Sequence, residues 1–346
     1  MKLALIVPGP FDTVSGGYIY DRRMVDEWRH VGHEIEVVEP AADTCLPEGG
    51  LVLIDGLALL AFDGMTTELS GPRVAGLIHH PVSTETGLDN ADRARLTAIE
   101  RRLLPALGHV IVTSETTAQT LANDFAVARD RITVVTPGTD TVPRAAGSSG
   151  PTCRILSVGT LIPRKGHDVL LRAFSKLFDL DWHLTIAGSP DRDPACARQL
   201  VGLAETLSIS DRVTFAGEVV GPALEALWQG SDMFALATNY EGYGMAVAEA
   251  LAHGLPVAVM QGGAAAVLVP PEGGVTCEPG DFVGLSKAMR RLIFSAGLRR
   301  AMSEVAWQAG QALPSWPTQA ALFIRQGWGS GPAQPVALRD ADSALP

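Results

Sequence analysis

The segment from residue 239 to residue 257 has the clearest chemical signal in the chain, and it reads NYEGYGMAVAEALAHGLPV. It follows an apolar run typical of a buried strand and continues as an apolar stretch typical of a helix. Gly242 and Gly244 permit a tight turn and a close approach of the backbone to a ligand. The segment therefore predicts free amides at Gly244, Met245 and Ala246 at a helix start, where they can bind an anion such as a diphosphate.

Two carboxylates flank this predicted turn. Glu241 and Glu249 are separated by eight positions, which is about 12 Å along a helix. That distance is too great for an acid and a base that act on one bond. It suits two hydroxyl clusters of one extended nucleotide sugar. The alternative is that Glu241 caps the helix and Glu249 lies on its solvated face.

Two other segments contain residue types that metals favour. His79 and His80 follow an apolar run, so they are expected at the carboxyl edge of a sheet. Adjacent histidines point in different directions and no third ligand is evident, which disfavours a metal site. Packing or capping is the alternative to a functional role. Asp191 and Asp193 form an Asp-x-Asp string between two prolines, which a turn with an N-cap explains. The four cysteines form no CxxC pair, and we expect no metal site.

Composition restricts the class of protein. The formal net charge is −11, which disfavours a protein that binds nucleic acid. The apolar run at the N-terminus is too short for a signal peptide, and no apolar stretch reaches the length of a membrane span. We expect a cytoplasmic protein, for which peripheral contact with a membrane stays open.

Short β-branched runs alternate with amphipathic segments, a pattern typical of parallel sheets with crossover helices. The first half predicts strands at 3–7, 34–38, 51–54, 74–78, 110–112 and 132–135, and helices at 19–30, 92–104 and 114–123. The second half predicts strands at 154–158, 183–187, 213–215, 233–237 and 256–259, and helices at 167–177, 194–207 and 245–253. The predicted fold class is α/β, with two Rossmann-like doubly wound domains that face a cleft.

A stretch of small residues, AAGSSGP, predicts a linker at 145–151. It would join an N-terminal domain at 1–144 to a C-terminal domain at 152–312. We expect a C-terminal helix at 313–328 that packs back on the first domain. The segment 329–346 is predicted to be a loose tail.

The string from Glu241 to Val257 resembles the E-x7-E signature of the retaining glycosyltransferases of family 4, which have the GT-B fold. Six further segments match that family in the same order: SGGY at 15–18, GLIHHP at 76–81, VVTPGTD at 134–140, SVGTLIPRKG at 157–166, LTIAG at 184–188 and VTFAG at 213–217. The resemblance extends to about residue 310. It departs at Thr160, where many relatives have Arg, at 237–238, where Pro-Ser is usual, and at 262–266, where GGAAA lacks a common Glu.

The resemblance implies that the domain at 1–144 is the acceptor side and that the domain at 152–312 binds the nucleotide sugar. It also implies roles for the matching positions. Glu249 would bind the ribose hydroxyls, and Glu241 with the amides of the Gly244 turn would hold the donor sugar and the distal phosphate. Arg164 and Lys165 would neutralise the departing diphosphate, since cations aimed at developing charge favour the transition state. The alternative for this pair is an ordinary exposed loop.

His79 would lie near the transferred sugar, with its backbone carbonyl facing the reacting carbon. The catalytic residues that the resemblance implies are His79, Arg164, Lys165 and Glu241. The implied donor-binding residues are Gly16, Gly17, Gly159, Arg164, Lys165, Gly217, Glu241, Gly242, Tyr243, Gly244, Met245, Ala246 and Glu249. On the acceptor side they are Tyr18, Tyr20, His80 and Glu85.

The sequence thus predicts a metal-independent, retaining glycosyltransferase. It would move a sugar from a nucleoside diphosphate sugar to a glycan, lipid or small-molecule acceptor, without a further cofactor. No carboxylate of the first domain stands out as a nucleophile. One alternative is a nucleotide-sugar-binding protein without transferase activity. A second alternative is an NAD-dependent oxidoreductase, although neither half shows G-x-G-x-x-G after its first strand with a suitably spaced acidic residue.

Overall fold

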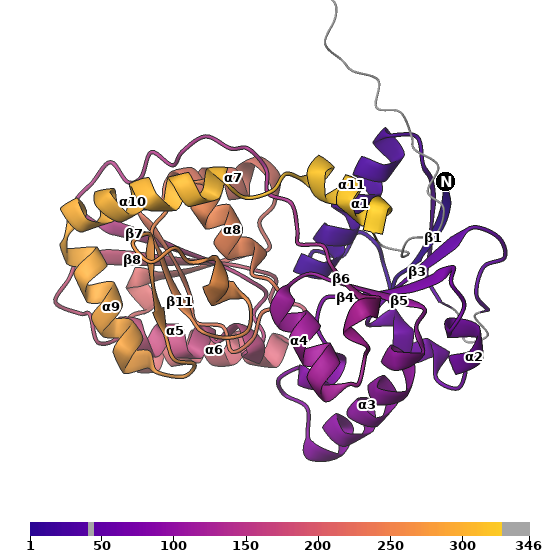
Figure 1. The fold of residues 1–346 in the computed structure, drawn as a ribbon. Helices are drawn as coiled ribbons and strands as arrows, with labels where there is room; N and C mark the ends of the chain where they lie inside the picture. Colours follow the sequence, from indigo (N-terminus) through magenta and orange to yellow (C-terminus); the bar gives the residue numbers. More distant parts are fainter. Residues whose placement is uncertain (41–44, 327–346) are drawn as a thin grey trace, which may run out of the picture.

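The computed structural model describes residues 1–40 and 45–326. They form two α/β domains, each with a sheet of six parallel strands (Figure 1). The predicted fold class is therefore confirmed. Among the described residues, no helix combines the length and the hydropathy needed to cross a bilayer. The tail expected at 329–346 lies outside the described residues.

In the first domain, helices cover both faces of the sheet. Its strands are β1 (Lys2–Ile6), β2 (Glu34–Val38), β3 (Leu51–Asp55), β4 (Val74–Ile78), β5 (His109–Val112) and β6 (Ile132–Val134). Its helices are α1 (Gly16–His30), α2 (Thr66–Leu69), α3 (Asn90–Leu103) and α4 (Glu115–Asp124). The strand order is β2-β1-β3-β4-β5-β6. The central strands read as continuous apolar runs because both of their faces are buried.

The second domain repeats this plan. Its strands are β7 (Cys153–Val158), β8 (Trp182–Ala187), β9 (Val213–Gly217), β10 (Met233–Leu236), β11 (Val257–Met260) and β12 (Gly274–Cys277). Its helices are α5 (His167–Phe174), α6 (Pro194–Thr206), α7 (Gly221–Gln229), α8 (Met245–Ala252), α9 (Phe282–Phe294) and α10 (Ala296–Gln311). The strand order is β12-β11-β10-β7-β8-β9. Asp193 caps α6 by accepting from the Cys196 amide at 2.9 Å, so the predicted N-cap is confirmed.

Both sheets have a switch point beside their first strand. Strand β1 lies between β2 and β3, and β7 lies between β8 and β10. The chain leaves neighbouring strands in opposite directions at such a point, which opens a crevice at their carboxyl ends. The loops after β1 and β3 and the loops after β7 and β10 are therefore the segments that can line a ligand site.

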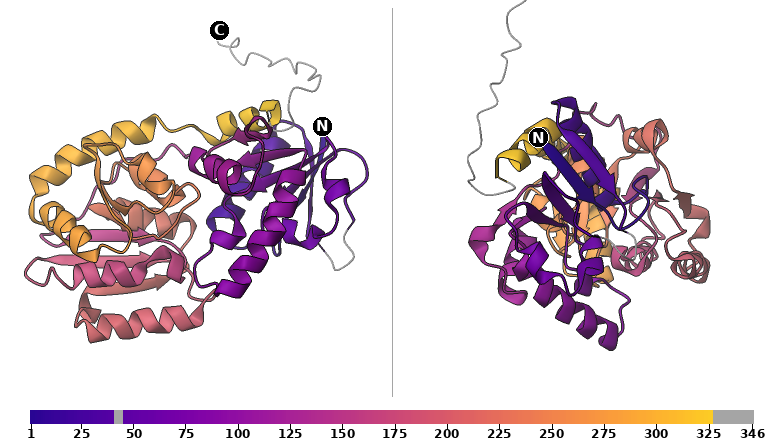
Figure 2. Two further views of the ribbon diagram at one scale, coloured as in Figure 1. Left: turned by 60° about the horizontal axis from the view of Figure 1, so that its bottom comes forward. Right: turned by 90° about the vertical axis from the view of Figure 1, so that its right-hand side faces the viewer.

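Helix α11 (Trp316–Gln326) follows the second domain in sequence but packs on α1 of the first domain (Figures 1 and 2). The indole of Trp28 donates to the Ala320 carbonyl at 3.2 Å. Its ring meets the Phe323 ring edge-on, with 4.8 Å between centroids. The chain thus crosses between the domains twice.

The other crossing includes the segment 145–151, which has no helix or strand. The Ala145 amide donates to the His253 carbonyl at 2.9 Å, and the Gly147 amide donates to the Gln229 carbonyl at 3.0 Å. This segment therefore lies against the second domain. The domain limits themselves stay a prediction.

Candidate active site

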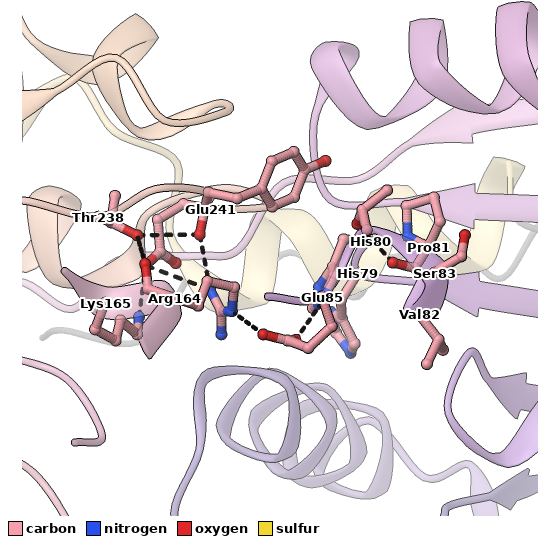
Figure 3. A network of polar contacts seen from close by, with 12 residues as sticks. His79, His80, Pro81, Val82, Ser83, Glu85, Arg164, Lys165, Thr238 and Glu241 are labelled. Atoms are coloured by element: carbon pink, nitrogen blue, oxygen red, sulfur yellow. Dashed lines mark hydrogen bonds and ion pairs between the residues drawn. The ribbon is translucent and has the colours of Figure 1, made fainter. Parts of the chain in front are cut away.

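A basic pair and a buried carboxylate meet at the switch point of the second sheet (Figure 3). Arg164 and Lys165 belong to a short 3-10 helix after β7, and Glu241 follows β10. Lys165 Nζ lies 2.6 Å from Glu241 Oε1, and Arg164 Nη1 lies 3.6 Å from the same oxygen. The Thr238 hydroxyl donates to it at 3.1 Å. Burial raises the pKa of Glu241, but the charges of Lys165 and Arg164 outweigh burial and hold that pKa below its usual value.

Arg164 also links the two domains. Its Nη1 donates to the Tyr240 carbonyl at 2.8 Å, and its Nε donates to Glu85 Oε1 of the first domain at 2.9 Å. The other Glu85 oxygen lies 3.1 Å from His80 Nε2. Burial raises the pKa of Glu85, but His80 and Arg164 together lower it to about 2. The structure thus places Glu85 and His80 at the cleft, with Glu85 bound to Arg164.

Two helix starts face each other across the same cleft. Gly244 is the N-cap of α8 with φ of +105°, a left-handed conformation that favours glycine. A Cβ placed on Gly16, the first residue of α1, would lie 4.0 Å from Met245 Sδ. The Met245 side chain packs against the core of the first domain. Both helix starts carry partial positive charge, so the space between them suits an anion.

The backbones of the two domains come close together at Gly242 and His79. A Cβ placed on Gly242 would lie only 2.2 Å from the His79 carbonyl oxygen and 3.7 Å from Thr113 Oγ1. The hydroxyls of Thr113 and Thr117 each donate to that same carbonyl at 3.4 Å. Because a side chain at 242 would push the domains apart, this position requires glycine in the closed arrangement.

Glu249 lines a separate wall of the cleft. It borders a cavity of ≈ 220 Å³ together with Asp140, Met245 and Trp316. Burial raises the pKa of Glu249 to about 7, with a further increase from Asp140 and an opposing effect of Lys165. A carboxylate in such a cavity can accept hydrogen bonds from ligand hydroxyls. The structure therefore places both glutamates of the E-x7-E string at the cleft, Glu241 before the α8 start and Glu249 within the helix.

The remaining glycines divide into two groups. A Cβ on Gly17 would lie 3.1 Å from His79 Cδ2, and a Cβ on Gly159 would lie 3.1 Å from Lys165 Cδ. Both glycines are therefore beside the site. Gly217 instead borders a different hollow of ≈ 320 Å³, together with Leu161 and Gly188.

Several predicted side chains are less accessible than expected. The structure does not place Tyr20 on the acceptor side, because its ring is fully buried and its hydroxyl donates to the Val135 carbonyl at 3.1 Å. Tyr243 is only 8% exposed, and Ala246 packs against the core of the second domain. Tyr18 is half-buried, and burial together with Asp55 and Asp21 raises its pKa.

Sequence reasoning missed four residues that shape the site. Glu100 on α3 accepts from the amides of Val82 and Ser83 at 2.5 and 3.0 Å, which holds the loop that follows His80. His167 lies 3.1 Å from the Gly159 carbonyl through Nε2, and burial lowers its pKa to about 4. The other two are Asp21 and Asp55, which contact His79.

Two glycosyltransferase families match this chain. "Glycosyltransferase Family 4" matches residues 52–142, and "Glycosyl transferases group 1" matches residues 140–308. A D-inositol 3-phosphate glycosyltransferase from Mycolicibacterium gilvum is 33% identical over 213 residues, which cover 56% of this chain and 48% of the relative. A mannosylfructose-phosphate synthase from Agrobacterium fabrum is 28% identical over 169 residues, 43% of this chain and 37% of the relative. The chain thus matches less than half the length of these curated relatives.

Solved structures share the fold. Sucrose-phosphate synthase from Thermosynechococcus elongatus superposes with a TM-score of 0.80 at 19% identity, over 94% of this chain and 97% of that one. HepE from Anabaena, in complex with UDP and glucose, superposes with a TM-score of 0.76 at 14% identity, over 94% and 98%. At these identities the similarity shows the fold alone. The two family matches together extend from residue 52 to residue 308. They show that the chain belongs to the family 4 glycosyltransferases, which have the GT-B fold.

Proposed function

We propose that this chain is a retaining glycosyltransferase that takes its sugar from a nucleoside diphosphate sugar. The proposal rests on one observation: the first turns of α1 and α8 and the side chain of Lys165 lie in one cleft between the domains. Two helix N-termini and a cation provide three sources of positive potential, as a diphosphate requires. Family membership supports the same reaction class.

The proposed division of labour follows the two switch points. Lys165 and Arg164 would stabilise the charge that develops on the diphosphate as the glycosidic bond breaks. Glu249 would accept from the ribose hydroxyls in its cavity, and Glu241 would orient the donor sugar. The His79 loop would present the acceptor from the first domain. Closure of the cleft would exclude water and so favour transfer over hydrolysis.

Attack on the donor sugar by an enzyme carboxylate is disfavoured by the contacts that the nearby carboxylates already make. Glu241 is paired with Lys165, and Glu85 is paired with Arg164. Asp21 and Asp55 of the first domain both face the His79 imidazole. Each is already engaged by a cation or an imidazole, which disfavours attack on a sugar carbon. Independence from a metal ion and a cytoplasmic location stay predictions.

The donor nucleotide is the first unknown to test. A panel of uridine, guanosine and adenosine diphosphate sugars should contain one that raises the melting temperature, because a ligand that binds only the native state stabilises it. With that donor, release of the nucleoside diphosphate should depend on an acceptor. UDP-glucose is a reasonable first donor, since structures of HepE hold UDP and glucose.

Two substitutions test the proposed site. Lys165→Ala and Glu249→Ala should each reduce transfer by about a hundredfold or more while the far-ultraviolet circular dichroism spectrum is kept. Asp63→Ala is a matched control, because Asp63 is exposed and paired with Arg102 on the outer face of α3. Near-normal transfer by both site variants would refute the site. Tight binding of a nucleotide sugar without any turnover, across a broad acceptor panel, would favour the binding protein instead.

A further inference from the structure

A buried cluster of three ionisable groups lies at the switch point of the first sheet. Asp21 comes from α1, Asp55 is the last residue of β3, and His79 directly follows β4. His79 Nε2 lies 3.3 Å from Asp21 Oδ1 and 3.5 Å from Asp55 Oδ2. Asp21 is 2% exposed and Asp55 is 3% exposed. Two carboxylates removed from water therefore share one imidazole nitrogen.

Such a cluster is stable only if positive charge balances it. A buried carboxylate without a partner is strongly destabilising. The second oxygen of Asp55 accepts from the Leu57 amide at 2.7 Å, but this backbone contact supplies no full charge. Burial lowers the pKa of His79. The hydrogen bond to Asp21 and the charges of Asp21 and Asp55 raise it and outweigh burial, so the net pKa is above its usual value. The two carboxylates therefore favour the form of the ring that carries a proton on both nitrogens.

The two carboxyls differ in how they pair with the His79 ring. Burial raises the pKa of Asp55, the nearby Asp21 raises it further, and the charge of His79 opposes both. Asp55 therefore takes up a proton more readily than an ordinary aspartate. Asp21, which is closer to His79, is the stronger partner of the imidazolium.

The environment of the His79 ring contains few other ionisable groups. From α1, the Tyr20 ring meets it edge-on at 5.3 Å between centroids. The next residue, His80, is turned toward Glu85 at 3.1 Å. The second domain approaches His79 through the backbone of Gly242, which meets its carbonyl oxygen. Among the described residues, Asp21 and Asp55 are the charged groups that pair with this ring.

The position of the ring gives its charge a purpose. Gly17, in the first turn of α1, is so close that a Cβ there would lie 3.3 Å from His79 Nε2. The imidazole therefore lies beside the helix start where the proposed diphosphate would bind. A fixed positive charge there adds to the helix dipole and stabilises an anion that forms during reaction.

We propose that Asp21 and Asp55 are positioning residues, which keep His79 as an imidazolium with its ring fixed against the first turn of α1. The proposal deepens the proposed function and rests on it for the purpose of the charge. The charge itself is independent of turnover, so it can be measured directly.

Nuclear magnetic resonance of the chain labelled with 15N-histidine tests the charge. The chain has eight histidines, and His79→Gln identifies the His79 signal. We expect the His79 midpoint in the unaltered chain to lie above that of an ordinary histidine. Asp21→Asn should lower that midpoint by about one to three pH units, because a carboxylate within about 4–6 Å shifts a partner by that amount. Asp55→Asn should lower it by less, and the control Asp63→Asn should leave it unchanged.

Two results would overturn the proposal. The first is a His79 midpoint that stays the same in both Asp21→Asn and Asp55→Asn. The second is a stoichiometric metal ion, found by elemental analysis of the unaltered chain and lost in Asp21→Asn, since a metal and not a proton would then bridge the three groups. If Asp21→Asn fails to fold, the His79 midpoint measured in Asp55→Asn decides alone.

Transfer kinetics separate this inference from the proposed function. The alkaline limb of the pH profile of kcat should move to lower pH in Asp21→Asn, while KM for the donor changes less than threefold. A packing role alone would lower activity equally at every pH. If no donor is turned over by the unaltered chain, the proposed function fails, and the resonance titration still decides the charge of His79.

Discussion

The Gly242→Ala substitution separates domain closure from folding. The added Cβ would lie 2.2 Å from the His79 carbonyl oxygen, whereas real Cβ atoms essentially never approach closer than 3.0 Å. The domains would have to separate by about 1 Å at the point where donor and acceptor meet. A misplacement of that size costs about a hundredfold in rate. We therefore expect kcat/KM for transfer to fall about a hundredfold.

The same substitution should leave each domain intact. The three atoms nearest to the added Cβ belong to His79 and Thr113 of the first domain, so the clash is between the domains. The melting temperature should change by less than about 2 °C, and donor affinity should change less than transfer. Gly202→Ala is the matched control, because a Cβ there meets nothing within 4 Å and alanine favours helix α6 by about 1 kcal/mol. Unchanged transfer by Gly242→Ala, measured as release of the nucleoside diphosphate, would refute the closed arrangement.

Three further predictions concern single residues around the cleft. Glu85→Gln removes the carboxylate that occupies Arg164, so the donor should bind about threefold more tightly by isothermal titration calorimetry, and weaker binding would count against the cross-domain pair. Glu249 has a pKa raised to about 7, so its ionised, hydrogen-bond-accepting form increases between pH 6 and pH 8. Donor affinity should rise over that range in the unaltered chain and stay level in Glu249→Gln. His167 is buried with a pKa lowered to about 4 from 6.5, so the unfolded chain binds more protons between those values and stability falls as the pH drops through them. Urea unfolding of His167→Gln should show a smaller loss between pH 6.5 and pH 4.5, and equal losses would contradict the assignment.

The strand positions were predictable where both faces of a strand are buried. Strand β4 consists of five buried residues, and its bounds agree with the sequence prediction. Strand β12 was missed because it is a four-residue edge strand with partly exposed side chains. Helix α7 was also missed, since it begins with a glycine and a proline. The sequence pattern therefore predicts strands well where every residue is buried, and poorly where a strand lies at the edge of a sheet.

The contacts of the site could be predicted only in part from the sequence. Glu241, Gly244 and Glu249 are close in sequence, so their spacing on a turn and a helix could be read directly. The pair of Glu85 and Arg164 joins residues 79 positions apart in different domains, and only closure brings them together. Asp21 is one of several charged residues along α1, and its contact with His79 depends on strand β3 lying beside β1. Sequence spacing alone carries no signal for such contacts.

The most direct measurement is a crystal structure of this chain with a nucleoside diphosphate bound. We predict that the diphosphate lies between Gly16–Gly17 and Gly244–Ala246, within hydrogen-bond distance of Lys165, and that the ribose contacts Glu249. A nucleotide bound outside this cleft, with Lys165 still paired only to Glu241, would contradict the account.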